Sequence, residues 1–237
     1  MQRMRRCVIF CAGAFDRLIV PIEKEDILLA ADGGLTHMQR LGLKPYAAIG
    51  DFDSLGFVPE DAQVFPVQKD DTDSMLAVKA GLQMGCREFL LYGSVDGPRL
   101  DHTLANLQTL IYLCEHGATG YLVGKDYLIT AVKNGSVTFA PEAKGILSVF
   151  CMGADARGVT LENVKYPLER GVLTAGFPLG VSNSFIGQSA RVCVDDGCLV
   201  LLGHQGECAN FIVMDIIHRR RQAAQGDHHR QQASNHC

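Results

Sequence analysis

The sequence predicts an α/β protein: an N-terminal open, mostly parallel sheet with helices on both faces, followed by a smaller all-β sandwich domain. Two patterns support this fold class. Up to residue 133, short apolar runs alternate with stretches of helical spacing, which is typical of a parallel sheet. From residue 134 onward the runs are short and β-like, turn residues separate them, and no amphipathic stretch reaches the length of a helix.

In the first part, apolar runs that end in turns predict strands, and apolar residues three and four positions apart predict helices. The expected strands are residues 7–11, 27–31, 47–49, 63–67, 89–92 and 121–123. The expected helices are residues 35–41, 72–84 and 101–115. The second helix has the clearest ends, because Thr72 and Asp73 open it and Gly85 closes it. This alternation assigns residues 1–133 to an α/β domain.

The second part begins after the turn-forming run Lys133-Asn134-Gly135. Its expected strands are residues 136–139, 146–151, 158–161, 189–194 and 198–202. Turn residues lie between them, including Asp195-Asp196-Gly197 before the last strand. We expect a β-sandwich domain over residues 134–217. Residues 218–237 are polar, basic and rich in histidine, and we expect them to be a disordered tail.

The composition of the chain indicates a globular protein and argues against nucleic acid and membrane as partners. Hydrophobic residues make up 47% of the 237 residues and charged residues 20%, which indicates a folded globular protein. The net charge of -4, without a long basic run in the body of the chain, argues against nucleic acid as a partner. No apolar stretch is long enough to span a membrane. Nine cysteines without a CxxC pair argue against a zinc ribbon and suit reduced thiols, so we expect a cytoplasmic protein.

Four aspartates each follow a predicted strand or begin the next helix: Asp32, Asp51, Asp53 and Asp73. Ligands of an open parallel sheet bind in the crevice at the carboxyl ends of its strands. Carboxylates gathered there repel one another unless a cation compensates, and Mg²⁺ prefers such oxygen ligands together with substrate phosphates. Any one of these aspartates alone is more simply a helix cap or a turn residue. As a group they predict a magnesium site.

Two further segments favour phosphate binding. Lys69 precedes a helix whose N-terminus offers unpaired N–H groups, and Arg99 follows a turn that contains Gly93 and Gly97. Solvated loops beside capped helices are the simpler explanation of each segment alone. His102 starts a helix and is more simply a hydrogen-bonding residue than an acid–base group. The chain has no GxxxxGK[ST] motif and no GxGxxG after its first strand, so neither a P-loop nor a dinucleotide fingerprint is expected.

These segments resemble, in order and spacing, the signature blocks of thiamine pyrophosphokinases. The blocks are ADGG (31–34), GDFDS (50–54), KDDTD (69–73), GPRLDHTLAN (97–106) and VSNSF (181–185). Each is moderately specific alone, and all five in order are strongly specific. The resemblance covers roughly residues 7–203.

The resemblance implies an Mg²⁺-dependent enzyme that transfers a pyrophosphoryl group from ATP to the hydroxyl of thiamine, giving thiamine diphosphate and AMP. It also implies a nucleotide-binding α/β domain, a thiamine-binding β-sandwich and a homodimer with thiamine at the subunit interface. Ser182 and Asn183 would then contact the aminopyrimidine of thiamine.

By position, the resemblance implies that Asp51, Asp53 and Asp73 hold the Mg²⁺. Asp32 would lie in the same acidic crevice, where it would support the metal or orient the thiamine hydroxyl. One of these carboxylates would accept the hydroxyl proton, and the sequence leaves open which one.

The same alignment of motifs implies that Lys69, Thr72 and Arg99 line the polyphosphate and that Asp101 holds the loop. Lys69 and Arg99 would offset charge on the transferring group. The family's usual Gly-Gly-Arg reads Gly97-Pro98-Arg99 here. Pro98 removes one backbone donor, so that contact with phosphate is in question.

Two other functions fit the same residues. A metal-dependent phosphohydrolase acting on a nucleotide or a thiamine phosphate would use the carboxylates to activate water. A thiamine- or nucleotide-binding regulator would keep the fold without turnover. Supplying ATP with and without thiamine separates these functions, because only the transferase makes AMP in a thiamine-dependent way.

Overall fold

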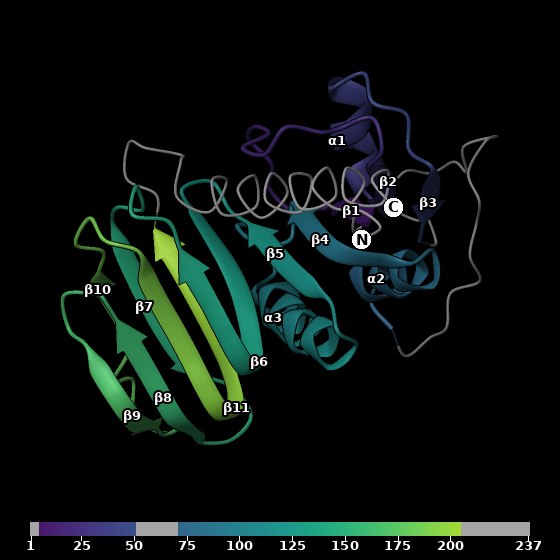
Figure 1. The fold of residues 1–237 in the computed structure, drawn as a ribbon. Helices are drawn as coiled ribbons and strands as arrows, with labels where there is room; N and C mark the ends of the chain where they lie inside the picture. Colours follow the sequence, from purple (N-terminus) through teal and green to yellow (C-terminus); the bar gives the residue numbers. More distant parts are fainter. Residues whose placement is uncertain (1–4, 51–70, 205–237) are drawn as a thin grey trace, which may run out of the picture.

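The computed structural model describes residues 5–50 and 71–204. Its first part contains β1 (Arg5–Phe10), β2 (Ile27–Ala31), α1 (Gly34–Arg40), β3 (Ala47–Ile49), α2 (Asp73–Gln83), β4 (Cys86–Tyr92), α3 (Leu100–Glu115) and β5 (Thr119–Val123). Its second part contains β6 (Tyr127–Phe139), β7 (Ile146–Cys151), β8 (Ala156–Glu162), β9 (Leu168–Leu173), β10 (Asn183–Ser184) and β11 (Ala190–His204). Figure 1 shows the two parts side by side.

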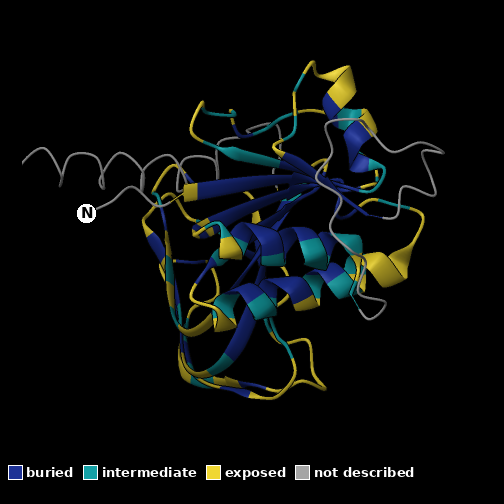
Figure 2. Cartoon of the chain, turned by 90° about the vertical axis from the view of Figure 1, so that its right-hand side faces the viewer, coloured by how far each residue is buried: buried dark blue, intermediate teal, exposed yellow. Residues whose placement is uncertain are grey.

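The first part is a parallel sheet in the order β5–β4–β1–β2–β3. Its central strands are buried on both faces, as expected for a sheet that helices cover on two sides. Val8 and Phe10 pack in one core cluster with residues of α1, and Cys7 and Ile9 pack in another with residues of α2 and α3. The helices therefore lie on opposite faces, with the buried strands between them (Figure 2).

The second part is antiparallel and continues the same sheet. β6 pairs with β5 through residues 128–130 and with β11 along its whole length. The other edge of β11 pairs with β7 in its C-terminal half and with β8 in its N-terminal half. An irregularity between Val194 and Cys198 separates these two halves of β11. β9 pairs with β8, and β10 pairs with β7.

The predicted parallel sheet with helices on both faces is confirmed. Strands 27–31, 47–49 and 146–151 have the predicted bounds. Strand 63–67 and the tail 218–237 lie outside the described residues. The predicted domain boundary at 133/134 falls within β6. No helix in the described part of the chain is long and apolar enough to cross a membrane.

Two predicted turns were wrong. Asn134 and Gly197 lie in facing strands, β6 and β11, where the amide oxygen of Asn134 accepts the Gly197 N–H at 2.9 Å. Both have positive φ, 46° and 118°, so these residues form an irregularity within a continuous ladder instead of ending the strands. β9 was not predicted, because Pro167 and Gly171 indicated a turn in this segment.

Candidate functional site

A cavity of about 270 Å³ opens at the carboxyl ends of β1, β2 and β4. The chain runs from β1 toward β3 on one side and from β4 toward β5 on the other, so the crevice lies where the strand order reverses. We call it the switch-point cavity. It is lined by residues 11–13, 31–32, 72–74, 93–95, 97–99, 102–103 and 106. Four residues predicted from the sequence are among them: Asp32, Thr72, Asp73 and Arg99.

Asp32 reaches the cavity because the chain turns sharply after β2. Its backbone has a φ of 45°, and its N–H donates to the carbonyl of Ile49 at 2.8 Å. Two residues later α1 begins against the end of β1, where a Cβ on Gly34 would lie 1.8 Å from the Phe10 carbonyl oxygen. Only glycine allows this approach. The ADGG segment thus positions the Asp32 carboxylate at the edge of the sheet.

The N-terminus of α2 forms a second wall. The Thr72 hydroxyl accepts the N–H of Met75 at 3.3 Å, which caps the helix. Asp73 lies in the first turn and is partly exposed. The remaining N–H groups and the positive end of the helix dipole favour an anion here. The carboxylate of Asp73 and an anionic ligand at the same helix end call for a compensating cation.

A chain of buried polar side chains connects this helix end to the loop after β4. The Thr72 hydroxyl lies 3.1 Å from the Ser74 hydroxyl, and Ser74 donates to the Asn106 amide oxygen at 2.8 Å. The Asn106 amide nitrogen donates to the Ser94 carbonyl oxygen at 2.7 Å. Ser74, Ser94 and Asn106 are all buried. This hydrogen-bond chain fixes the two cavity walls relative to each other, because each buried group depends on the next for a partner.

Sequence reasoning missed these three residues. Asn106 ends the GPRLDHTLAN block and Ser74 follows the KDDTD block, yet neither was given a role. The available signal was a polar residue on the buried face of a predicted helix, since Asn106 is spaced with Thr109, Leu110 and Leu113 on α3. A buried amide in such a position requires hydrogen-bond partners.

Arg99 and Asp101 form an exposed pair at the start of α3. The Arg99 Nε donates to the carboxylate at 2.9 Å and Nη2 donates to its other oxygen at 2.6 Å. The Arg99 hydrogen bond lowers the pKa of Asp101 to about 2, and the same bond raises the pKa of Arg99. Arg99 lines the switch-point cavity, so Asp101 holds the guanidinium at its rim without lining the cavity itself.

Cys11 lines the cavity but is not a nucleophile. Its side chain is buried, and burial followed by the charge of Asp73 raises the pKa of its thiol to about 12. A thiol must ionise to attack, so Cys11 stays inert near neutral pH.

Five other predicted site residues are not among those that line the cavity in the described part of the chain. Asp51, Asp53 and Lys69 are outside the described residues. Gly50, the residue before Asp51, lies against Asp32: a Cβ on Gly50 would be 3.2 Å from the Asp32 Cα. Ser182 and Asn183 do not line the switch-point cavity, because they lie in and next to β10, at the far end of the second part (Figure 1).

Ser182 and Asn183 differ in how far their side chains are available to a ligand. Ser182 is exposed and has a φ of 61°. Asn183 is buried, and its amide oxygen accepts the N–H groups of Tyr166 and Ser184, each at 2.9 Å. Its amide nitrogen donates to the Tyr166 carbonyl at 2.7 Å. Asn183 therefore holds two backbone segments together next to the exposed hydroxyl of Ser182.

The carboxylates of the switch-point cavity are the described candidates for holding the predicted Mg²⁺. Residues 5–50 and 71–204 contain no group of three or more His, Cys, Asp or Glu side chains that could hold a metal ion. Two carboxylates, of Asp32 and Asp73, line one cavity beside a helix N-terminus. Carboxylate oxygens are the ligands Mg²⁺ prefers, and it commonly uses only one or two of them together with phosphate oxygens. The donor chemistry fits Mg²⁺.

Comparison with known families gives two matches that together span most of the chain. Residues 20–122 match the family model for the thiamin pyrophosphokinase catalytic domain. Residues 136–199 match the model for the thiamin pyrophosphokinase vitamin B1 binding domain. The junction between the two matches falls where the parallel sheet ends and the antiparallel part begins.

Individual proteins give the same result. A thiamine pyrophosphokinase of Bacillus subtilis is 26% identical over 189 residues, covering 76% of this chain and 88% of that protein. Its crystal structure aligns with a TM-score of 0.74 at 25% identity, over 85% of this chain and 99% of that one. The yeast thiamin pyrophosphokinase structure has the same fold, with a TM-score of 0.68 at 14% identity over 86% of this chain and 87% of that chain.

Proposed function

This chain belongs to the thiamin pyrophosphokinase family, and we propose on that premise that it uses Mg²⁺ to transfer the pyrophosphoryl group of ATP to the hydroxyl of thiamine. The observation that carries the proposal is the switch-point cavity. It combines the carboxylates of Asp32 and Asp73 with the N-terminus of α2 and the guanidinium of Arg99. Two anionic groups beside two features that attract anions are what a metal–polyphosphate site requires.

In the proposed reaction, the thiamine hydroxyl oxygen forms a bond to the β-phosphorus of ATP. The bond from that phosphorus to the bridging oxygen of the α-phosphate breaks, and AMP leaves with the electron pair. The hydroxyl proton passes to a carboxylate of the cavity, and Asp32 and Asp73 are the described candidates. Arg99 and the helix N-terminus hold the phosphates, so positioning and electrostatics supply most of the rate enhancement.

The metal would be held by Asp73 with Asp51 and Asp53, and Asp32 would support it from the same cavity. When bound, Mg²⁺ supplies charge neutralisation and orientation of the phosphates. Lys69 and Thr72 would line the polyphosphate with Arg99, and Asp101 would keep the guanidinium in place. Pro98 lines the cavity without a backbone N–H to offer to phosphate, and the neighbouring Arg99 guanidinium would supply a contact there.

The proposed thiamine-binding residues belong to the all-β part of the chain. We propose that this part is a sandwich domain extending from about residue 134. Ser182 would contact the aminopyrimidine directly, and Asn183 would orient the segment through its bonds to Tyr166. Ser182 directly precedes β10, which lies on the opposite side of the molecule from α2, whose first turn lines the switch-point cavity (Figure 1). A homodimer in which each Ser182 segment faces the cavity of the partner subunit accounts for this separation. The seven cysteines in the described part of the chain are free thiols, which suits the reducing cytoplasm.

The decisive experiment measures AMP and thiamine diphosphate when the purified chain is given Mg-ATP with and without thiamine. We expect equal amounts of AMP and thiamine diphosphate, and neither product without thiamine or after chelation of the metal. Release of inorganic phosphate regardless of thiamine would support a phosphohydrolase instead. Calorimetric binding of thiamine or ATP without any product would support a regulator that has lost turnover.

A further inference from the structure

Arg99 is carried by a short loop between β4 and α3, residues 93–99, which we call the arginine loop. Its last three residues, 97–99, line the switch-point cavity. Arg99 is exposed, and its guanidinium bonds to Asp101 in the first turn of α3. An exposed guanidinium binds and orients a phosphate well only if the backbone that carries it is held in place.

The first half of the arginine loop is fixed from inside the molecule. The Ser94 hydroxyl donates to the Leu91 carbonyl at 2.8 Å, and the Ser94 carbonyl accepts the Asn106 amide N–H at 2.7 Å. The next side chain, Val95, is buried. Residues 96, 98 and 99 are exposed, so this interior packing ends before the residues that present the guanidinium.

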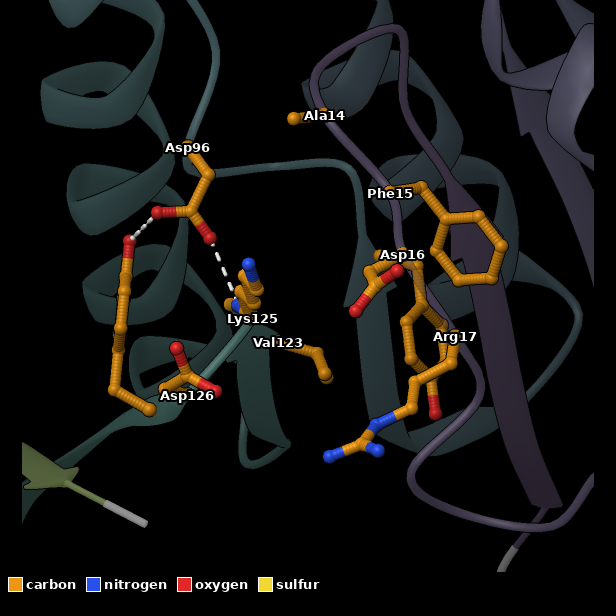
Figure 3. Close-up of a pocket in the computed structure, with 11 residues that line it drawn as sticks. Ala14, Phe15, Asp16, Arg17, Asp96, Val123, Lys125 and Asp126 are labelled. Carbon is orange, nitrogen blue, oxygen red and sulfur yellow. Dashed lines mark hydrogen bonds between the residues drawn. The ribbon is translucent and has the colours of Figure 1, made fainter. Parts of the chain in front are cut away.

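The Asp96 carboxylate holds the second half of the loop to a different segment (Figure 3). One of its oxygens accepts the backbone N–H of Lys125 at 2.8 Å, and the other accepts the Tyr127 hydroxyl at 2.5 Å. Both are charge-assisted hydrogen bonds, which are stronger than bonds between neutral groups. We call these two bonds the Asp96 bridge.

The segment that receives the Asp96 bridge is itself well fixed. It joins β5 to β6, two paired strands, and the Gly124 N–H donates to the Tyr127 carbonyl at 3.0 Å. The Tyr127 ring lies over Gly124, where a Cβ would be 2.6 Å from the ring, so a larger residue would displace it. Burial and the bond to Asp96 raise the pKa of the Tyr127 hydroxyl, which therefore stays protonated and remains a donor.

The backbone at position 96 would be more comfortable with glycine. Asp96 has a φ of 61°, in the left-handed region, where a side chain costs energy and glycine does not. An aspartate at this position is accounted for by what its carboxylate binds. The carboxylate, and not the local conformation, is therefore what residue 96 contributes to the loop.

We propose that Asp96 is a positioning residue for pyrophosphoryl transfer, because the Asp96 bridge fixes the loop that presents Arg99 to the polyphosphate. This inference rests on the proposed function, which assigns Arg99 to the phosphates. Asp96 does not line the switch-point cavity, although its neighbours Val95 and Gly97 do, so it acts through the backbone of the loop. The bridge also connects the phosphate contact to β6, the strand that both parts of the sheet share.

Three variants break or preserve the Asp96 bridge. Asp96→Gly removes the carboxylate at a φ that glycine adopts freely. Tyr127→Phe removes one of the two bonds and leaves the backbone of the loop untouched. Asp96→Asn keeps an oxygen that can accept the Lys125 N–H and an amide that can bond to the Tyr127 hydroxyl.

The matched control is Asn134→Gly. Asn134 also has a positive φ, 46°, and its side chain also accepts a backbone N–H, but it lies outside the switch-point cavity. Every variant is made in the wild-type chain and again in the Arg99→Ala chain. Calorimetry with Mg²⁺ gives Kd for inorganic tripolyphosphate, a probe that has no nucleoside. Initial rates give kcat and KM for ATP and for thiamine.

In the chain that keeps Arg99, Asp96→Gly should weaken tripolyphosphate binding about fivefold and lower kcat about tenfold, because a loosely held contact loses binding energy and orientation. In the Arg99→Ala chain the same change should alter either value by less than about twofold, since the group that it positions is gone. Tyr127→Phe should have a smaller effect with the same dependence on Arg99. Asp96→Asn should recover most of the loss, and KM for thiamine and the Asn134→Gly control should not change.

Three results would overturn the inference. Equal losses from Asp96→Gly with and without Arg99 would show a general effect on the fold. A raised KM for ATP with unchanged tripolyphosphate binding would show that Asp96 contacts the nucleoside directly. Unchanged values in both Asp96→Gly and Tyr127→Phe would show that the loop needs no bridge. The proposed function fails on a separate result, a wild-type chain that makes no AMP from ATP and thiamine, and the tripolyphosphate measurement requires no turnover.

Discussion

The two parts of the sheet use their surfaces differently. In the first part, helices cover both faces, and the polar groups gather at one edge around the switch-point cavity. In the second part, the segment between β8 and β11 leaves large apolar side chains exposed, including Phe177 (64%) and Leu179 (56%). The first part forms the switch-point cavity of about 270 Å³, whereas the second part forms a smaller hollow of about 160 Å³ beside the exposed Phe177 and Leu179. The difference supports our proposals that the chemistry belongs to the first part and that the second part contacts another copy of the chain.

The largest expected effect is on the chemical site of the first part. Asp73→Asn should lower kcat by on the order of 10²–10³-fold, because it removes a carboxylate from the proposed metal and phosphate site. Coupled AMP-release rates at saturating Mg²⁺ measure it, and circular dichroism checks the fold. Asp71→Asn is the matched control: this residue pairs with Lys79 at 2.6 Å outside the cavity. Equal losses in both variants would remove Asp73 from the chemistry.

The next largest effect tests whether the exposed apolar segment of the second part contacts another copy of the chain. Phe177→Asp places a charge in the exposed apolar segment and should convert the proposed dimer to a monomer, as measured by light scattering. Because Ser182 lies in the same segment, thiamine turnover should fall at least tenfold at low protein concentration. Tyr46→Asp, at an exposed aromatic residue of the first part, should change neither quantity. A wild-type chain that is monomeric while active would refute the dimer.

A smaller effect concerns the hydrogen-bond chain behind the cavity. Asn106→Leu leaves the Ser94 carbonyl and the Ser74 hydroxyl without their buried partner, so the free energy of unfolding should fall by about 1–3 kcal/mol. Because the two cavity walls lose their connection, kcat should fall more than KM for thiamine rises. Urea unfolding and steady-state kinetics measure the two changes. Gln108→Leu, on the exposed side of the same helix, should alter neither, and equal behaviour of the two variants would contradict a positioning role.

The smallest effect is expected at the Arg99–Asp101 pair. The pKa of Asp101 is lowered in the folded chain to about 2, so any stability from this pair is present above the unfolded value of about 3.9 and is lost as the pH falls through 2. Both side chains are exposed, and exposed pairs contribute little. Thermal unfolding of Asp101→Asn should therefore match the wild type between pH 5 and pH 8. A clear loss of Tm would show that the pair is structural.

The sequence predicted the parallel part well because its signals were local. Residues 27–31 and 47–49 are apolar runs bounded by turn residues, and buried strands of a parallel sheet have that pattern. The rule that ligands bind at the carboxyl ends of parallel strands predicted one crevice for Asp32, Asp51, Asp53 and Asp73. Asp32 and Asp73 line one cavity, and Asp51 and Asp53 lie outside the described residues. Their chemical roles remain predictions.

The antiparallel part was harder to predict because turn residues also occur inside long strands. Asn134 and Gly197 favour a turn locally, yet each lies in a strand that continues past it, and their hydrogen bond forms only when β6 and β11 pair. Asn106 was missed for a related reason. Its role depends on which carbonyl the loop after β4 brings to it, and that partner lies twelve residues earlier in the chain.

The length of β6 limits how the molecule can move. Its first residues pair with β5, and the whole strand pairs with β11, so both parts are fastened to one continuous ribbon of backbone hydrogen bonds. The two parts are joined by this shared strand and not by a flexible linker. Any motion between the two parts must twist β6 and the strands paired with it. Cutting the chain within β6 would remove strand pairing from both fragments. Unfolding should accordingly proceed as a single cooperative event.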